Sequence, residues 1–196
     1  MTDTTQPPIE TAGRGMAVAF LVAGTWFMEH LDGTAIVPAL PQMAASFAVR
    51  PADLNVGISA YLLTLAVFIP ASGWAALRFG TRRVFVAAIA IFTISSLLCS
   101  MAQTLPQFVG ARILQGAGGA MMVPVGRLAV LRIVPKHRLI YAIAALTWPA
   151  LVAPVLGPPL GGMVADTFGW RWIFYFNLPL GLIAFVSALR LEHLPT

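Results

Sequence analysis

Residues 84–102 read VFVAAIAIFTISSLLCSMA, a run of apolar and small residues without a single Asp, Glu, Lys or Arg. At about 1.5 Å per residue, such a run is long enough as a helix to cross a hydrocarbon core roughly 30 Å thick. Arg82 and Arg83 stand directly before it, and basic residues beside an apolar run mark a membrane surface. The stretch therefore predicts a transmembrane helix.

The composition of the whole chain agrees with this prediction. Of the 196 residues, 59% are hydrophobic and only 10% are charged, whereas a soluble domain has about 25% charged residues. The net charge is +5, but the basic residues lie between apolar runs, so we expect no nucleic-acid partner. Cys99 is the only cysteine, which excludes a disulfide framework and a cysteine-rich metal site. We expect no metal and no cofactor.

Five further runs resemble residues 84–102. We therefore expect an all-α integral membrane protein whose six helices satisfy their own backbone hydrogen bonds. The bundle covers residues 15–190, between a cytoplasmic N-terminal segment (1–14) and a cytoplasmic C-terminal end (191–196). The expected spans lie near residues 15–37, 54–77, 84–102, 107–131, 139–165 and 172–189. The segments between them are short, rich in Pro and Gly, and too short for a soluble domain.

The basic residues between the spans predict the orientation, because cytoplasmic loops carry an excess of Lys and Arg. One side holds only Arg50 and Arg171. The other side holds eight basic residues: Arg14, Arg78, Arg82, Arg83, Arg132, Lys136, Arg138 and Arg190. We expect a multi-pass protein of the inner (plasma) membrane with both termini in the cytoplasm.

Three ionisable residues inside the expected spans are candidates for function. An Asp at the middle of a span costs about 2.5–3.5 kcal/mol, so such a residue normally has a partner. Glu29 and Asp32 are three residues apart and share one helix face. Asp32 and Arg112 lie at the same expected depth, roughly 8 Å from the outer ends of their helices, which predicts an ion pair. Proton loss from either carboxylate would strengthen its attraction to Arg112, a chemical basis for proton coupling.

Structural interpretations of the same residues stay open. Asp32, followed by Gly33 and Thr34, could only end or kink its helix, and Glu29 could only bond a neighbouring helix. An intramembrane enzyme has no support, because the sequence has no HExxH, no GxSxG and no Gly-rich phosphate loop ending in Lys. We do not expect an enzyme, and a structural membrane subunit stays as an alternative.

Four motifs in chain order resemble signatures of the drug:proton antiporter group of the major facilitator superfamily. LDGT (31–34) with ALP (39–41) is similar to LDxT…ALP, and RILQGAGGA (112–120) is similar to RxxQGxGxA. APVLGPPLGG (153–162) resembles the antiporter motif GxxxGPxxGG. The sixth span opens in the family's manner, with WRWIF (170–174) and NLP (177–179).

The resemblance implies the N-terminal half of the major facilitator fold, one of two bundles that rock around a central site. It implies export of a hydrophobic or amphipathic compound in exchange for protons, with Asp32 and Arg112 lining the cavity. The residues that we expect to couple protons and substrate are Asp32, Glu29, Arg112 and Gln115. The bend of the antiporter motif would be carried by Gly157, Pro158, Gly161 and Gly162.

Residues 73–83, GWAALRFGTRR, resemble the family's cytoplasmic gate motif GxLADRxGRR. Leu77 stands where the family has its Asp, a carboxylate that helps to latch the two halves together. The residues of the motif that could act in the gate are Gly73, Arg78, Gly80, Arg82 and Arg83.

Six expected helices make half of a family member, which has twelve or fourteen. We therefore expect the inner wall, including Glu29 and Arg112, to face lipid unless a second six-helix half or a second copy of the chain covers it. The expected partners are the bilayer, protons, a small lipophilic substrate and this second bundle. The alternative is a truncated, transport-inactive membrane protein.

Overall fold

The computed structural model describes residues 8–134 and 138–190, and every regular element in these residues is helical. The long helices are α1 (Pro8–Ala35), α3 (Asn55–Phe79), α4 (Thr81–Met101), α5 (Leu105–Ile133), α6 (Leu139–Phe168) and α8 (Asn177–Arg190). The short elements are the 3-10 turns η1 (Val37–Ala39) and η2 (Pro51–Leu54) and the helices α2 (Leu40–Phe47) and α7 (Arg171–Tyr175).

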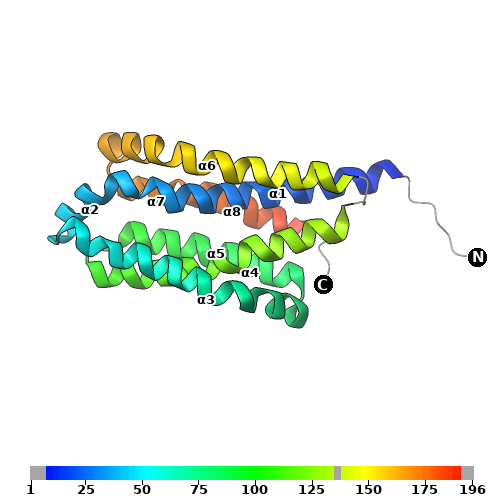
Figure 1. The fold of residues 1–196 in the computed structure, drawn as a ribbon, viewed down its shortest axis with the longest axis horizontal. Helices are drawn as coiled ribbons and strands as arrows, with labels where there is room; N and C mark the ends of the chain where they lie inside the picture. The colour runs from blue at the N-terminus through cyan, green and yellow to red at the C-terminus, as the bar shows by residue number, and fades with distance from the viewer. Residues whose placement is uncertain (1–7, 135–137, 191–196) are drawn as a thin grey trace, which may run out of the picture.

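The long helices lie side by side along the longest axis of the molecule (Figure 1). Helix α1 packs most extensively against α6, α5 packs between α3 and α4, and α8 packs against α4. The described part of α1 begins, and α8 ends, at the same end of the bundle (Figure 1). The expected all-α bundle is confirmed.

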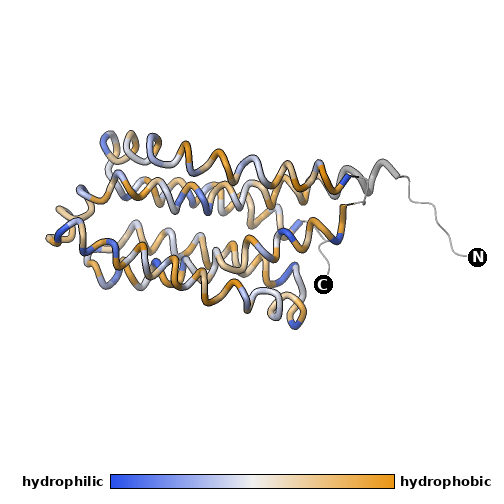
Figure 2. The backbone as a smooth tube through the Cα atoms, viewed as in Figure 1, coloured by the Kyte–Doolittle hydropathy of each residue, from blue (hydrophilic) through white to orange (hydrophobic). Residues whose placement is uncertain are grey.

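The surface of this bundle suits a membrane. Five of the described helical segments are long and apolar enough to cross one: 51–79, 81–101, 105–133, 139–168 and 171–190. Helix α1 runs beside them over 28 residues, and its Glu29, His30 and Asp32 lower its hydropathy. Figure 2 shows hydrophobic positions spread along the coloured parts of the long helices. Large apolar side chains such as Leu63, Trp148 and Ile183 are exposed on the outside, where hydrocarbon solvates them.

The connection after α1 differs from the sequence expectation of a simple loop. It forms η1, α2 and η2, and each of these short helices has Pro in its first turn: Pro38, Pro41 and Pro51. Proline suits a first turn because its missing N–H has no intrahelical acceptor there. The same prolines that indicated breaks in the chain therefore start short helices.

The sixth predicted span is divided at Phe176 into α7 and α8. Pro179 has no N–H to donate to the carbonyl four residues earlier, so a regular helix cannot pass through this point without losing a hydrogen bond. The break makes Asn177 the first residue of α8 and leaves it buried. Its amide reaches the middle of the bundle.

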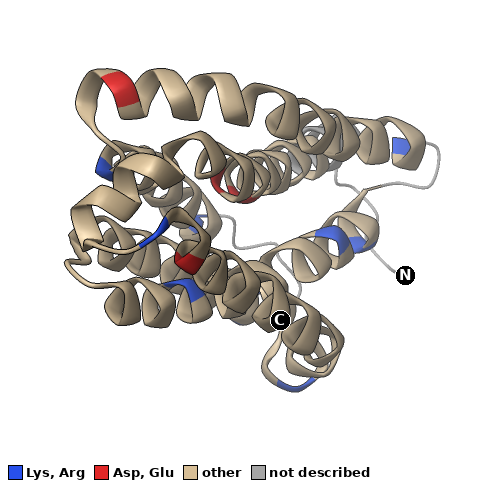
Figure 3. Ribbon diagram, turned by 60° about the vertical axis from the view of Figure 1, so that its left-hand side comes forward, with Lys and Arg blue, Asp and Glu red and all other residues tan. Residues whose placement is uncertain are grey.

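The core is divided into two apolar clusters with a polar layer between them. One cluster fills the end where α8 terminates, with Val22, Phe85 and Phe92 in it. The other fills the opposite end and includes Phe108 and Phe174. Few charged residues interrupt the helices in Figure 3, and the polar layer between the clusters contains Asp32, Arg112, Gln115, Asn177 and Ser96.

Candidate functional site

The polar layer is organised around an ion pair between α1 and α5. Arg112 Nη1 donates to Asp32 Oδ2 over 2.6 Å, as the matched depths in the sequence predict. Arg112 is 0% exposed and Asp32 is 1% exposed. Attraction between opposite charges at this distance is strong in a medium of low dielectric constant, so the pair fixes α1 against α5.

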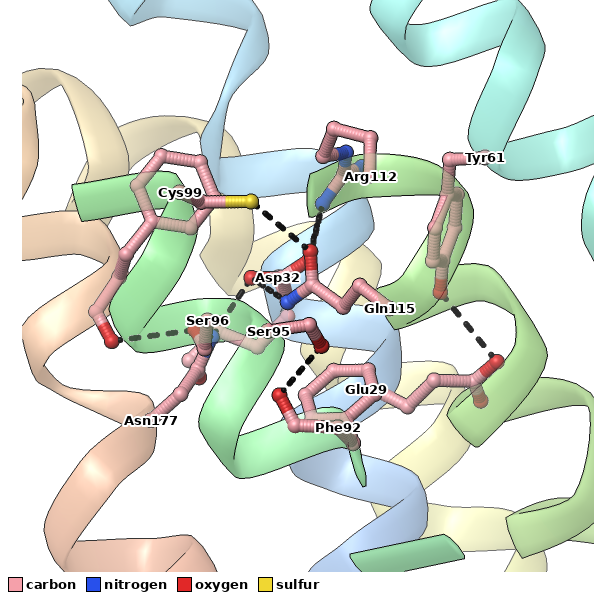
Figure 4. A network of polar contacts seen from close by, with 12 residues as sticks. Glu29, Asp32, Tyr61, Phe92, Ser95, Ser96, Cys99, Arg112, Gln115 and Asn177 are labelled. Atoms are coloured by element: carbon pink, nitrogen blue, oxygen red, sulfur yellow. Dashed lines mark hydrogen bonds and ion pairs between the residues drawn. The ribbon is translucent and has the colours of Figure 1, made fainter. Parts of the chain in front are cut away.

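Two amide side chains complete the surroundings of the carboxylate. Gln115 Nε2 donates to Asp32 Oδ1 over 3.1 Å, and Asn177 Nδ2 donates to the same oxygen over 2.6 Å. Gln115 Oε1 accepts from Arg112 Nη1 over 2.7 Å, and Asn177 also donates to Ser96 Oγ over 3.0 Å. Figure 4 shows these groups converging from α1, α4, α5 and α8 on one point. Asp32 thereby links α1 to α5 and α8, and Asn177 extends the network to α4.

Glu29 lies one helical turn before Asp32 and points away from this cluster, towards Tyr61 on α3 (Figure 4). Tyr61 donates its hydroxyl to Glu29 Oε1 over 3.4 Å. The ring of Tyr61 also contacts Arg112, whose guanidinium carbon lies 4.1 Å from the ring centroid. Tyr61 therefore contacts Glu29 through its hydroxyl and Arg112, the partner of Asp32, through its ring.

The expectation that Glu29 and Arg112 face lipid is wrong. Arg112 is fully buried and Glu29 is 7% exposed within this single chain. The physical reason is that side chains of α3, α5 and α8 reach α1 at this level and donate hydrogen bonds to the carboxylates. Arg112 lies inside the protein and does not line the cavity described next, whereas Asp32 lies at its wall.

A cavity of about 230 Å³ approaches Asp32 and Asn177 from the side of α6. Its lining is otherwise almost entirely apolar and includes Leu31, Leu160 and Phe176. A small apolar group could enter here and lie close to the polar layer.

The glycines of the antiporter-like motif lie where α6 crosses α1. A Cβ atom at Gly157 would overlap the Thr34 side chain, and one at Gly161 would overlap the Ala35 carbonyl. A Cβ at Gly162 would lie 3.6 Å from Pro38, an ordinary contact. Two residues of the GxxxG pattern thus bring the helix backbones together, within one turn of Asp32. Pro158 lies inside α6 without ending it.

The gate-like segment forms the one-residue turn between α3 and α4. Gly80 has φ +87, a conformation that residues with a Cβ rarely adopt. Arg82 donates to the Leu189 carbonyl near the end of α8 over 2.5 Å. Arg78 and Arg83 are exposed at this end, and Gly73 lies on α3 with open space beside its Cα. Leu77 is 76% exposed, at the position of the family's Asp.

Sequence reasoning brought together Asp32, Arg112 and Gln115 but missed Asn177 and Ser96. A buried amide at the start of an apolar span was the signal available for Asn177, because polar residues inside a membrane normally bond to another helix. Ser96 carried no such signal, since a serine in a membrane helix can bond to its own backbone.

No group of three His, Cys, Asp or Glu side chains in the described residues could hold a metal ion. The polar layer and its neighbour Glu29 provide one ion pair, one further carboxylate and neutral hydrogen-bonding groups. Such a set can hold and exchange protons or cations within a bundle.

Comparison with known proteins places the chain in a family. The model of the Major Facilitator Superfamily matches residues 15–196. The chain belongs to the Major Facilitator Superfamily. The match includes every helix that contributes to the polar layer.

Similar proteins include the multidrug resistance proteins named MdtD of three bacteria. The chain is 48% identical to that of Klebsiella pneumoniae subsp. pneumoniae over 172 residues, 88% of this chain and 36% of the relative. It is 48% identical to that of Cronobacter sakazakii over 172 residues, again 88% of this chain and 36% of the relative. It is 46% identical to that of Yersinia enterocolitica over 175 residues, 89% of this chain and 37% of the relative. The chain thus spans about a third of the length of these relatives and corresponds to their N-terminal part.

A solved structure shares the fold. The crystal structure of a D-xylose-proton symporter superposes with a TM-score of 0.77 at 15% sequence identity, over 89% of this chain and 48% of the symporter. At this identity the likeness concerns the fold alone. The bundle therefore has the architecture of about half of a superfamily transporter.

Proposed function

We propose that this chain forms the N-terminal bundle of a proton-coupled exporter of hydrophobic or amphipathic small molecules. The observation that carries the proposal is the buried Asp32–Arg112 ion pair, in which Asp32 accepts from three N–H donors on α5 and α8. Buried ionisable groups in membrane helices mark ion and proton pathways. The relatives named as multidrug resistance proteins support the substrate class.

Proton coupling follows from the charge of the carboxylates. A proton on Asp32 or Glu29 removes a negative charge and weakens the attraction to Arg112, and proton loss restores it. Because Asp32 bonds to α5 and α8, a change of its charge alters contacts between helices. Gln115 positions both partners of the ion pair, since it donates to Asp32 and accepts from Arg112.

The bend and the gate are also part of the proposal. The crossing of α1 and α6 at Gly157 and Gly161 supports a bend next to Asp32, because a change in the tilt of α6 is felt directly by the backbone of α1. The positive φ of Gly80 and the exposed arginines at the α3–α4 turn support a gate at the end of the bundle where both described termini lie. Exposed Leu77 lacks the carboxylate for a latch.

We propose that this end faces the cytoplasm of an inner-membrane protein. The arginines gathered there, with Arg132, Arg138 and Arg190 among them, support this orientation. We also propose that transport requires a second helical bundle, either from a longer polypeptide or from a second copy. The support for this is that the match covers 48% of the symporter chain. The burial of Asp32, Glu29 and Arg112 does not require a second bundle, because the single chain already buries them.

The test is efflux of a lipophilic dye, driven by a proton gradient, from cells that express the chain alone or with a second six-helix bundle. We expect efflux only with the second bundle, and we expect Asp32→Asn to abolish it. Efflux by the chain alone that survives Asp32→Asn would contradict both the second bundle and the proton role. No efflux in either arrangement would favour a transport-inactive membrane protein.

A further inference from the structure

The groove between α4 and α8 has a basic mouth and an apolar floor. Its hollow measures about 380 Å³. Two arginines, Arg82 and Arg83, stand at one end of its lining. The rest of the lining is apolar and consists of Val86, Ala87, Ala90, Phe185 and Leu189. The groove is therefore charged at one end and hydrophobic along the rest of its length.

The two parts of the groove lie at different depths in a membrane. Arg82, Val86 and Ala90 are four residues apart and lie one above another on α4, over about 12 Å at 1.5 Å per residue. Arg82 and Arg83 directly precede the apolar run 84–102, and Ala90 lies within that run. Basic residues that flank an apolar run stay at the membrane surface. The groove thus runs from the headgroup region into the hydrocarbon.

A close contact between the two helices limits the groove towards the middle of the bundle. A Cβ atom at Gly181 would overlap the Thr93 side chain, so α8 lies directly against α4 at this level. Towards the arginine end, the small side chains of Ala87 and Ala90 leave the surface hollow. The groove can therefore take part of a long chain that enters beside the arginines.

The mouth of the groove carries positive charge. Arg82 is held across it by the hydrogen bond that it donates to the Leu189 carbonyl on α8. Arg83 also lines a second hollow, of about 350 Å³, at the α3–α4 turn together with Arg78 and Arg132. None of the acidic side chains that the structure describes lines either hollow. An anion at the mouth would therefore meet no carboxylate among them.

A phosphate group attached to an acyl chain fits both parts of the groove. Guanidinium groups match the geometry of phosphate oxygens, and the positive N-terminal end of α4 reinforces the attraction. A free phosphate would use the mouth alone, whereas a phospholipid places its phosphate at the surface and its chains in the hydrocarbon. An anionic headgroup is favoured over a zwitterionic one, because the latter also brings an ammonium group towards the arginines.

We propose that the α4–α8 groove binds an anionic phospholipid of the leaflet at the arginine end, with its phosphate on Arg82 and Arg83 and an acyl chain against Ala87, Ala90 and Phe185. This site lies apart from the polar layer and needs neither a proton nor a transported compound. A lipid bound in it holds the end of α8 against the start of α4.

The test measures lipid binding to the purified chain in detergent by native mass spectrometry. Dioleoyl phosphatidylglycerol is the probe, dioleoyl phosphatidylethanolamine is the zwitterionic comparison, and glycerol 3-phosphate is the competitor without acyl chains. We expect phosphatidylglycerol to bind about tenfold or more tightly than phosphatidylethanolamine, and glycerol 3-phosphate not to displace it. Phosphatidylglycerol should also raise the melting temperature, because a ligand of the folded state stabilises it.

The charge variants locate the phosphate. Arg83→Gln should weaken phosphatidylglycerol binding about fivefold, and Arg82→Gln with Arg83→Gln about 25-fold, since each basic residue contributes about fivefold. Arg83→Gln alone decides the test if the double variant does not fold, because exposed Arg83 makes no bond to α8 like that of Arg82. Arg138→Gln is the control, since Arg138 is exposed at the same end and does not line the groove. Equal losses for Arg83→Gln and Arg138→Gln would overturn the proposal.

The floor variants locate the acyl chain. Ala90→Phe fills the floor without changing the charge, and it should weaken phosphatidylglycerol binding at least as much as Arg83→Gln does. Ile94→Phe, at an exposed position one turn further along α4 and outside the lining, should have no effect. Displacement of the lipid by glycerol 3-phosphate, or unchanged binding in Ala90→Phe, would show a plain anion site and refute the proposal. A dimer that Ala90→Phe separates would instead make the groove an interface between copies, which also refutes it.

Discussion

Two Asp–Arg pairs in this chain have almost the same geometry and opposite surroundings. Asp32 and Arg112 are 2.6 Å apart with both side chains buried. Arg50 and Asp53, before α3, are 2.8 Å apart, with 83% of the Arg50 side chain exposed. Because water can replace either partner of the outer pair but neither partner of the inner one, distance alone does not measure what an ion pair contributes.

The largest expected effect breaks the inner pair. Arg112→Ala leaves Asp32 buried without a counter-charge, so the free energy of unfolding in detergent should fall by about 3–5 kcal/mol. Chemical or thermal unfolding followed by circular dichroism measures this. The double variant Asp32→Asn with Arg112→Gln removes both charges of the pair and should be more stable than Arg112→Ala. A double variant that is less stable would mean that the amides cannot replace the pair.

The next effect tests whether the inner pair depends on the packing of α1 against α6. Gly161→Ala places a methyl group against the Ala35 carbonyl, and overpacking of this kind costs about 1–3 kcal/mol. Gly162→Ala is the matched control, since its methyl group meets only an ordinary contact with Pro38. Equal melting temperatures for the two variants would show that the close approach of the backbones is not required.

A smaller effect is expected at the end of the bundle that holds the arginines. Arg82→Ala removes the hydrogen bond to the Leu189 carbonyl and should lower the free energy of unfolding by about 1 kcal/mol. Arg83→Ala, next to it and exposed, should change it by less than about 0.5 kcal/mol. A loss at Arg82 as large as that of Arg112→Ala would contradict the rule that water satisfies charges at this end.

The smallest effect is expected from the outer pair. Asp53→Asn removes its negative charge, but Arg50 remains hydrated, so the melting temperature should stay within the error of the measurement. Thermal unfolding at low and high salt checks this, because an exposed pair is screened by ions. A clear loss of stability that salt does not reduce would mean that this pair is shielded from water.

The sequence was sufficient for properties that depend on position along a helix. The apolar runs predict the helical bundle, and the matched depths of Asp32 and Arg112 predict their contact. Which groups surround a side chain, by contrast, depends on how all the neighbouring helices pack. For this reason the burial of Glu29 and Arg112 was predicted wrongly, and the bond from Asn177 to Asp32 was missed.

The short helices after α1 and the break at Phe176 show a second limit of the sequence. Proline indicates where a hydrogen bond is missing, but it does not say whether a helix starts there, as at Pro41, or is divided there, as at Pro179. The choice depends on tertiary contacts. At the first of these sites, Gln42 bonds to the Ala165 carbonyl and to the Trp170 amide, which fixes α2 against the end of α6.

The direct backbone contact at Gly161 has a mechanical consequence. Side chains at most helix interfaces can change rotamer and absorb a displacement of a few tenths of an ångström, but no side chain lies between α6 and Ala35 at this crossing. Sliding or tilting of α6 therefore displaces the backbone of α1 by nearly the same amount, one turn away from Asp32. The crossing acts as a stiff joint through which motion in the outer layer of the bundle reaches its charged centre.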